Sequence, residues 1–358
     1  MTTETAPAQG APPPVDERVR KVSLVSRLLG RPELGAVIAA VIVWVFFAIV
    51  AADNNFVSMP TTAAIFNRAA PLGILALGVT LLMIAGEFDL SIGSVVGFTG
   101  MAIMVMVTPA DAGGMGWGLW LALGVTLILA VLVGLFNGVL VQWTKLPSFI
   151  ITLGGLFIFR GLAIAIPRMM TNRTQLGNLD QVAGFDFFDK LFGTRISIGG
   201  ANFDIAILWW FALTALFTYM LLRTRYGNWI FGAGGDANAA RNTGVPVNRV
   251  KIVLFVGTAI VALLVALIQA IQFNSSDSLR GTLKELEAIT AAVVGGTLLT
   301  GGYGSVVGAL FGALIFAMVQ QGIIITGVDG DWFRVFVGGV LVIAVIFNNA
   351  IRARATRR

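Results

Sequence analysis

The chain has 358 residues, of which 57% are hydrophobic and only 12% are charged. So few charges could not cover the surface of a soluble globule, and a disordered chain would be far less apolar. Cysteine and histidine are both missing from the sequence, which excludes disulfides, thiolate metal sites and histidine general bases.

Apolar stretches recur from about residue 36 to the C-terminus. They predict an all-α, polytopic α-helical membrane protein, because a helix that crosses a bilayer needs about 20 such residues. The apolar pattern is interrupted near Gly86 and Gly301, where we expect broken or half helices. About ten transmembrane helices are expected, over residues 36–52, 69–85, 90–108, 118–142, 147–165, 205–222, 251–272, 286–300, 305–325 and 333–350.

These spans divide the chain into a transmembrane domain, residues 35–350, and two short ends. Residues 1–34 form an N-terminal tail that is expected to be disordered at first and then basic, and residues 351–358 form a basic C-terminal tail. Within the transmembrane domain, two connecting segments are long, at about 167–204 and about 223–250.

The distribution of charge predicts which side each segment faces. With ten spans and the N-terminus inside, the inner segments hold 15 of the 24 Lys and Arg residues and seven of the 18 acidic residues. The inner side then has a net charge of +8, and the remaining nine basic and eleven acidic residues give the outer side −2. Because basic residues favour the cytoplasmic side, we expect both termini and the 223–250 segment in the cytoplasm.

Polar side chains within apolar spans are candidates for a translocation pathway. Ionisable groups at membrane depth are costly and are usually functional. Two of the candidates could instead lie in a cytoplasmic turn and cap the helix that begins near Leu90. Others could simply bond to neighbouring helices rather than face a wet pathway. The candidates are Glu87, Asp89, Ser91, Asn137 and Thr152.

The inner segment contains a run that predicts a short helical turn exposed to the cytoplasm. Gly235 breaks the chain, Asp236 is a good N-cap, and Gly244 is placed to end the turn. Such a turn between two spans is typical of a docking element, although an amphipathic surface turn without a partner would look the same. The candidate docking residues are Gly235, Asp236, Ala239, Ala240, Arg241 and Gly244.

Small residues are concentrated in the C-terminal spans, where they allow helices to approach closely. Contact with a substrate is the alternative role for this region. The string GSVVG occurs at 93–97 and again at 304–308, which indicates either an internal repeat or a coincidence in a chain rich in Gly and Val. The expected packing residues are Gly295, Gly296, Gly301, Gly302, Gly304, Gly308 and Gly312.

Catalytic and nucleotide-binding motifs are missing from the sequence. It contains no GxxxxGK[ST] phosphate loop and no HExxH, GxSxG or CxxC. We therefore expect a protein that is not an enzyme and binds no cofactor. In a membrane protein the net charge of +6 indicates cytoplasmic loops rather than a nucleic-acid partner.

In four segments the sequence resembles the permease subunit of bacterial ABC importers for simple sugars, of the ribose/xylose/arabinose/galactoside-type branch. Residues 86–94 are similar to the family pattern GGxDLSVGS, and residues 137–161 to the run NG…LPxFIxTLG…RG. Residues 286–308 are similar to LxAIxAxVxGGTxLxGGxGSxxG. The inner turn is similar to that of the family, with Asp236 where the family more often has Asn and Val245 where it often has Ile. The resemblance covers about 55–350. Glu87 departs from it, because the family usually has glycine there.

The resemblance implies a permease that moves a monosaccharide or related polyol into the cytoplasm across the bacterial inner membrane by alternating access. A separate ATPase, which holds ATP and Mg²⁺, would dock on residues 235–245. A periplasmic or lipid-tethered sugar-binding protein would dock outside, and a second, commonly identical permease subunit would complete the pathway within the lipid bilayer. The alternative is an ion-coupled secondary transporter that uses Glu87 and Asp89 as ion sites, although such a carrier does not need the long inner loop.

Overall fold

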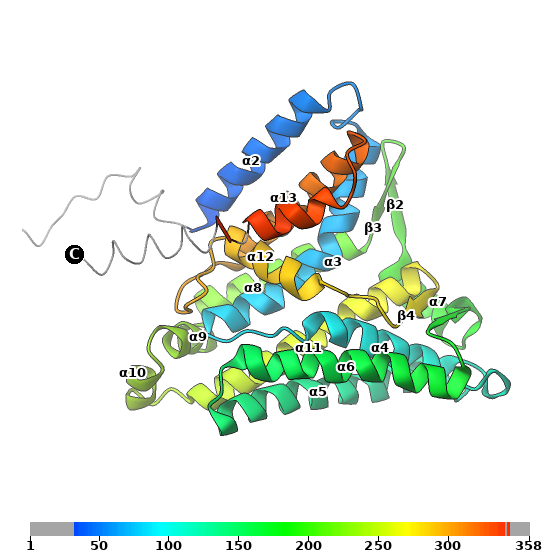
Figure 1. Cartoon of the computed structure of the whole chain (residues 1–358), viewed down its shortest axis with the longest axis horizontal. Coiled ribbons are helices and arrows are strands. Elements are labelled where there is room, and N and C mark those ends of the chain that lie inside the picture. The colour runs from blue at the N-terminus through cyan, green and yellow to red at the C-terminus, as the bar shows by residue number, and fades with distance from the viewer. Residues whose placement is uncertain (1–31, 341, 344–358) are drawn as a thin grey trace, which may run out of the picture.

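The computed structural model describes residues 32–340 together with residues 342 and 343. It is a helical bundle with two small two-stranded sheets at one end (Figure 1). The helices are α2 (Pro32–Val50), α3 (Met59–Ile84), α4 (Ile92–Val107), α5 (Leu119–Thr144), α6 (Ser148–Thr171), α7 (Phe185–Phe188), α8 (Ala206–Arg223), α9 (Arg225–Gly235), α10 (Ala237–Asn242), α11 (Val247–Gln272), α12 (Lys284–Val294) and α13 (Val306–Ile325). The strands are β1 (Gln175–Gly177), β2 (Arg195–Ile198), β3 (Ala201–Asp204) and β4 (Ser275–Asp277).

The helices confirm the predicted fold class of a polytopic α-helical membrane protein. Within the described residues, 7 helices are long and apolar enough to cross a membrane, namely α2, α3, α5, α6, α8, α11 and α13. Helix α4 is apolar but has only 16 residues. Each of these helices overlaps one of the predicted spans.

Two predicted spans need correction, and three predicted segments lie partly or wholly outside the described residues. Helix α3 begins ten residues before the expected start at residue 69, with Ser58 as its N-cap. The expected span 286–300 is a helix only as far as Val294, because the glycine-rich chain that follows forms turns. The last span is helical over residues 332–340, and most of its remainder is not described. The N-terminal tail up to residue 31 and the tail 351–358 are not described either.

Helices α3 and α11 form the centre of the bundle. Helix α3 packs against α12 and α13, and helix α11 packs against α4 and α5. The helices α3 and α11 also pack against each other. The two GSVVG strings open α4 and α13, which pack mainly on different central helices, α11 and α3.

The predicted outer segment contains short strands that the sequence did not indicate. Strand β1 pairs with β4, and β2 pairs with β3, both antiparallel. The second pair is joined by an ion pair of 3.3 Å between Arg195 and Asp204. These strands and α7 lie at the end of the bundle opposite α9 and α10 (Figure 1), so the two long connecting segments occupy opposite ends.

Helices α12 and α13 cross with their backbones in contact. A Cβ atom added to Gly308 would lie 1.9 Å from the carbonyl oxygen of Gly295, and one added to Gly312 would lie 2.0 Å from that of Ala291. Gly296 follows with a φ of +90° and Gly304 lies against Ile84. Since no side chain fits between the two helices here, the small residues at this crossing determine how closely they approach.

We expect Gly308→Ala to lower the thermal stability of the protein. Its methyl group would overlap the Gly295 carbonyl, and overpacking of this kind costs about 1–3 kcal/mol. Gly257→Ala in α11 is the matched control, because its Cβ would have no neighbouring atom within 4 Å. Thermal unfolding of the two purified variants checks this expectation, and equal melting temperatures would contradict the packing argument.

Candidate translocation core and coupling element

The chain leaves helical geometry between α3 and α4, at residues 85–91. Backbone groups that lose their helical partners within a membrane must find others inside the protein. The Phe88 N–H donates to the Ser148 hydroxyl at 2.9 Å, and the Leu90 N–H donates to the Thr152 hydroxyl at 3.0 Å. Two hydroxyls one turn apart on α6 therefore support the non-helical segment.

Asp89 lies at the centre of a buried hydrogen-bond network. Its side chain is 2% exposed. The Ser91 N–H and hydroxyl donate to one carboxylate oxygen at 2.8 and 2.6 Å, and the Thr258 hydroxyl donates to the other at 2.9 Å. The amide of Asn137 donates in turn to the Ser91 hydroxyl at 2.8 Å. These donors replace water around a carboxylate that would otherwise be costly to bury, and they join the non-helical segment to α5 and α11.

The position of Thr258 along α11 gives the depth of this network. At 1.5 Å per residue, the 26 residues of α11 extend about 39 Å, and Thr258 lies about 16 Å from the start of the helix. Lys251 lies only about 6 Å from that start. Asp89 is therefore well inside the length of a helix that crosses the membrane, whereas groups near Lys251 lie toward its inner end.

Glu87 is separated from the buried network. Its carboxylate accepts a hydrogen bond from the Lys251 ammonium at 2.7 Å, and both side chains are 12% exposed. The structure thus brings four of the five pathway candidates together and places Glu87 apart from them, in an ion pair at the inner end. Glu87 and Asp89 are only two positions apart in the sequence, but Glu87 is paired with a cation and Asp89 accepts hydrogen bonds from neutral donors.

Two hydroxyls of this region, those of Ser148 and Thr258, were not among the predicted pathway residues. Ser148 has the four-residue spacing from Thr152 that places both on one face of a helix, and Thr258 is a hydroxyl within a long apolar span, so a signal was present for both. Arg160 on α6 donates to the carbonyls of Ser278 and Arg280 at 2.8 and 3.0 Å. The sequence held no signal for this contact, because the two carbonyls come from a distant part of the chain.

The predicted inner turn is a short helix, α10. The Asp236 carboxylate accepts hydrogen bonds from the N–H groups of Asn238 and Ala239 at 2.9 and 3.0 Å, which is the geometry of an N-cap. Gly244 follows the helix with a φ of +88°. Ala240 is buried against the bundle, while Ala239, Arg241 and Gly235 are exposed. Helix α10 thus presents one face to solvent at the inner end of the molecule.

Helix α9, which precedes α10, is anchored to the start of α11. The Tyr226 hydroxyl donates to the Val250 carbonyl at 3.2 Å. Burial raises the pKa of the Tyr226 phenol to about 12, so the hydroxyl keeps its proton and remains a donor over the physiological pH range.

Three interruptions of the chain meet where α9 ends, at a contact that we name the glycine junction. It comprises Gly86 after α3, Gly234 and Gly235 before α10, and Gly301 and Gly302 before α13. The Gly302 N–H donates to the carbonyl of Ile84, the last residue of α3, at 2.8 Å. A Cβ on Gly234 would lie 1.8 Å from that carbonyl oxygen, whereas the nearest atom to a Cβ on Gly235 is 4.0 Å away. The end of α9 is therefore in direct backbone contact with the end of α3, and α10 follows α9 after the single residue Asp236.

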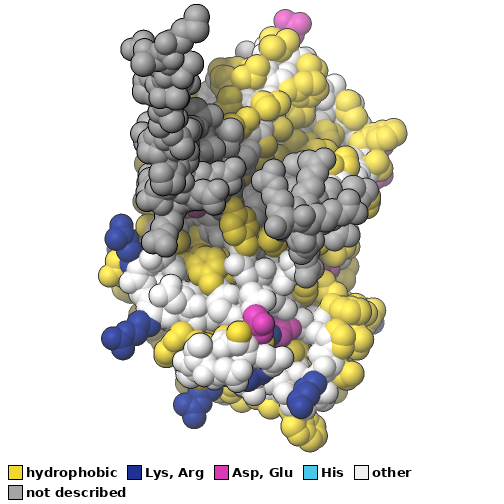
Figure 2. All heavy atoms as spheres, turned by 90° about the vertical axis from the view of Figure 1, so that its left-hand side faces the viewer, with side chains coloured by type: hydrophobic (Ala, Val, Ile, Leu, Met, Phe, Trp, Pro, Cys, Tyr) yellow, Lys and Arg dark blue, Asp and Glu magenta, His cyan; other side chains and the backbone are white. Residues whose placement is uncertain are grey.

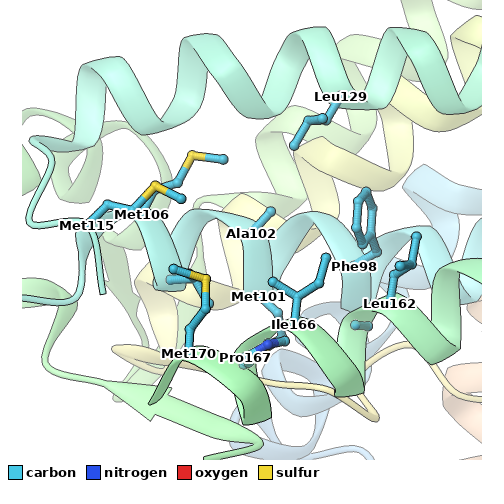
Figure 3. Close-up of a pocket in the computed structure, with 12 residues that line it drawn as sticks. Phe98, Met101, Ala102, Met106, Met115, Leu129, Leu162, Ile166, Pro167 and Met170 are labelled. Atoms are coloured by element: carbon cyan, nitrogen blue, oxygen red, sulfur yellow. The ribbon is translucent and has the colours of Figure 1, made fainter. Parts of the chain in front are cut away.

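An apolar hollow of about 220 Å³ lies between α4, α5 and α6 near their outer ends. Figure 3 shows its methionine, leucine and phenylalanine side chains, including Phe98, Met106 and Met170. Its lining side chains offer no hydroxyl, amide or charge. Such a hollow cannot replace the water around sugar hydroxyls, so it does not form a sugar site. Among the described residues, no group of three or more acidic side chains could hold a metal ion.

The fold and these sites define a polytopic membrane permease with a helix break in its core and a capped helix at its inner end. A family model described as the permease component of branched-chain amino acid transport systems matches residues 61–345, and the chain belongs to this family. No solved structure matches the chain significantly.

Curated relatives cover most of the chain. The xylose transport system permease protein XylH of Escherichia coli K12 is 30% identical over 89% of this chain and 92% of its own length. The autoinducer 2 import system permease protein LsrC of Salmonella typhi is 30% identical over 91% and 88%. LsrD of Klebsiella pneumoniae, a permease of the same kind of system, is 32% identical over 77% and 79%. These relatives confirm the resemblance to permease subunits of ABC importers. A permease of this kind works with a separate ATPase and a binding protein.

We expect Asp89→Ala to destabilise the protein and Asp89→Asn to be tolerated. Alanine leaves the N–H and the hydroxyl of Ser91 without their acceptor, at about 1–3 kcal/mol for each buried group. Asparagine keeps an acceptor for Ser91, and its amide can donate to the Thr258 hydroxyl, which still donates to the Phe255 carbonyl. Membrane abundance and thermal unfolding of both variants check this expectation. An asparagine variant as unstable as the alanine variant would show that the network needs the negative charge.

Proposed function

We propose that this chain is the permease subunit of an ABC importer that moves a monosaccharide or related polyol into the cytoplasm. It lies in the bacterial inner membrane with both termini inside, as a homodimer. Its ATPase docks on α10, and its sugar-binding protein docks on the opposite end, near the strands. The named substrates of the relatives, together with a core that has few buried charges, support a neutral polar substrate.

The observation that carries the proposal is the contact of α9, which leads directly into α10, with the helix break at the glycine junction. A force applied to α10 by an ATPase acts at Gly234, which touches the end of α3. The same interruption continues into the Asp89 network at membrane depth. The backbones in the junction are in direct contact, so they cannot move independently of one another. A displacement of α10 is therefore transmitted to residues 85–91, the non-helical segment after α3.

The charge distribution supports the orientation. The end of the bundle that carries α9 and α10 is seen in Figure 2, where Lys and Arg side chains are spread over the surface. Lys145, Arg241 and Lys251 lie at this end, as expected for the cytoplasmic side. Three of the strands at the opposite end, β1 to β3, belong to the segment 167–204, whose four acidic residues balance its four basic ones.

The ion-coupled alternative has no support from the relatives, whose names describe import-system permeases. Its two acids also occupy different surroundings, since Glu87 is paired with Lys251 and Asp89 accepts hydrogen bonds from its neighbours. A carrier that exchanges protons at both sites would have to break both sets of interactions.

The proposal is tested by uptake into membrane vesicles that contain the chain together with its partner ATPase and binding protein. We expect uptake of radiolabelled xylose, ribose or a related polyol to require ATP and the binding protein, and to persist when a protonophore removes the ion gradient. Uptake that needs the gradient and not ATP would replace the proposal with the ion-coupled alternative.

We expect Gly234→Ala to uncouple ATP hydrolysis from transport, and Gly235→Ala to have little effect. Both replace one glycine of the same helix end, but only the Gly234 methyl would overlap the Ile84 carbonyl. Stimulation of the ATPase by the loaded binding protein should fall severalfold or more in the first variant and remain near the wild-type value in the second. The coupling route fails as an explanation if the two variants behave alike at equal membrane abundance.

A further inference from the structure

A polar hollow of about 530 Å³ opens at the inner end of the bundle, and neither the Asp89 network nor the glycine junction forms part of its lining. It is bordered by the end of α5, the exposed face of α10, the start of α11 and the segment after α3. We name it the basic hollow, because its charged residues are mainly Lys and Arg. Its lining residues are Glu87, Val141, Gln142, Lys145, Leu146, Asn238, Arg241, Asn248 and Lys251.

The charges of the basic hollow leave a positive excess. Three bases and one acid line it, and the acid, Glu87, is already neutralised by Lys251 at 2.7 Å. Lys145 and Arg241 remain, and they reach the hollow from two different elements. A hollow with a net charge of +2 favours an anion.

The Arg241 guanidinium is held in place before any ligand binds. One of its terminal nitrogens donates to the Asn238 side chain at 3.0 Å, and the other donates to that of Asn248 at 3.2 Å. Lys145 ends α5 in the left-handed conformation, with a φ of 57°. A guanidinium of fixed orientation beside an ammonium is a suitable combination for the oxygens of a phosphate group.

Exposed apolar side chains lie next to the basic hollow, on the turn between α5 and α6. Trp143 is 78% exposed, Phe149 is 51% exposed and Leu146, which itself lines the hollow, is 47% exposed. Tryptophan beside basic residues at the end of a membrane helix is typical of the level of the lipid headgroups. The hollow therefore opens at the height where a phospholipid has its phosphate, with apolar surface beside it for the acyl chains.

We propose that the basic hollow binds the phosphate of an anionic phospholipid from the adjacent leaflet, with Lys145 and Arg241 as its ligands and the α5–α6 turn as the surface for its acyl chains. Because Arg241 and Asn238 belong to α10, the bound headgroup fixes α10 relative to α5. The site shares Arg241 with the face of α10 on which the ATPase is proposed to dock, so lipid binding is measured on the permease alone and its outcome does not rest on the proposed transport function. A soluble phosphorylated metabolite is the other source of the same chemistry.

The test is lipid binding by the full-length chain, purified, delipidated and measured by native mass spectrometry and by titration in detergent. The probes are phosphatidylglycerol, phosphatidylcholine and, for the soluble source, inorganic phosphate and glycerol 3-phosphate. We expect phosphatidylglycerol to bind more tightly than phosphatidylcholine, and Lys145→Gln/Arg241→Gln to weaken its binding about tenfold or more. Phosphate and glycerol 3-phosphate should not compete at millimolar concentration.

Two matched variants make the test specific. Arg223→Gln/Arg225→Gln removes two exposed bases of the same end that do not line the hollow, and it should bind phosphatidylglycerol like the wild type. Lys145→Arg/Arg241→Lys keeps both charges and should retain most of the affinity, which separates loss of the site from loss of the fold. Equal binding by the two charge-removal variants would overturn the proposal, and tight competition by glycerol 3-phosphate would overturn the lipid as its source.

Discussion

In a bilayer, a backbone N–H or C=O that leaves a helix cannot turn to water, and the rest of this structure depends on that constraint. The non-helical segment 85–91 lies beside helices that cross the membrane, so its N–H groups bond to hydroxyls on α6 and to the Asp89 carboxylate. The loop before α13 meets the same constraint with backbone alone, since the Gly302 N–H donates to the Ile84 carbonyl. Polar side chains and glycines are two solutions to one problem.

These two solutions give the molecule a route from surface to core. The glycine junction brings the end of α9, which leads into α10, against the end of α3. From the end of α3 the chain continues directly into the segment held by Asp89. The backbone of this segment is already unwound. A transporter must expose its polar groups to the substrate first on one side of the membrane and then on the other. A segment that is already non-helical can change its conformation in this way without breaking a helix.

Electrostatics separates two acids that stand almost side by side in the sequence. Glu87 forms an ion pair with Lys251 near the inner end, where it borders a hollow of positive excess. Asp89 is buried deeper and has hydroxyl and N–H donors in place of a cation. Glu87 thus contributes to the charge at the inner membrane interface, whereas Asp89 joins the helices of the core by hydrogen bonds. Removing either one is thus expected to have a different consequence.

The class of protein, most of the spans and the family could be predicted from the sequence, because each depends on local composition or on ordered short motifs. The length of apolar runs is enough to predict a membrane helix, and the Asp236 cap of α10 depends only on residues two and three positions away. The start of α3 was predicted ten residues too late, since its first turns carry polar residues that an apolar count rejects. Tertiary structure alone decided that Asp89 meets Thr258, that Glu87 meets Lys251 and that Gly234 meets Ile84. Each of these contacts joins residues more than 140 positions apart, and the packing of helices, rather than any local preference, brings them together.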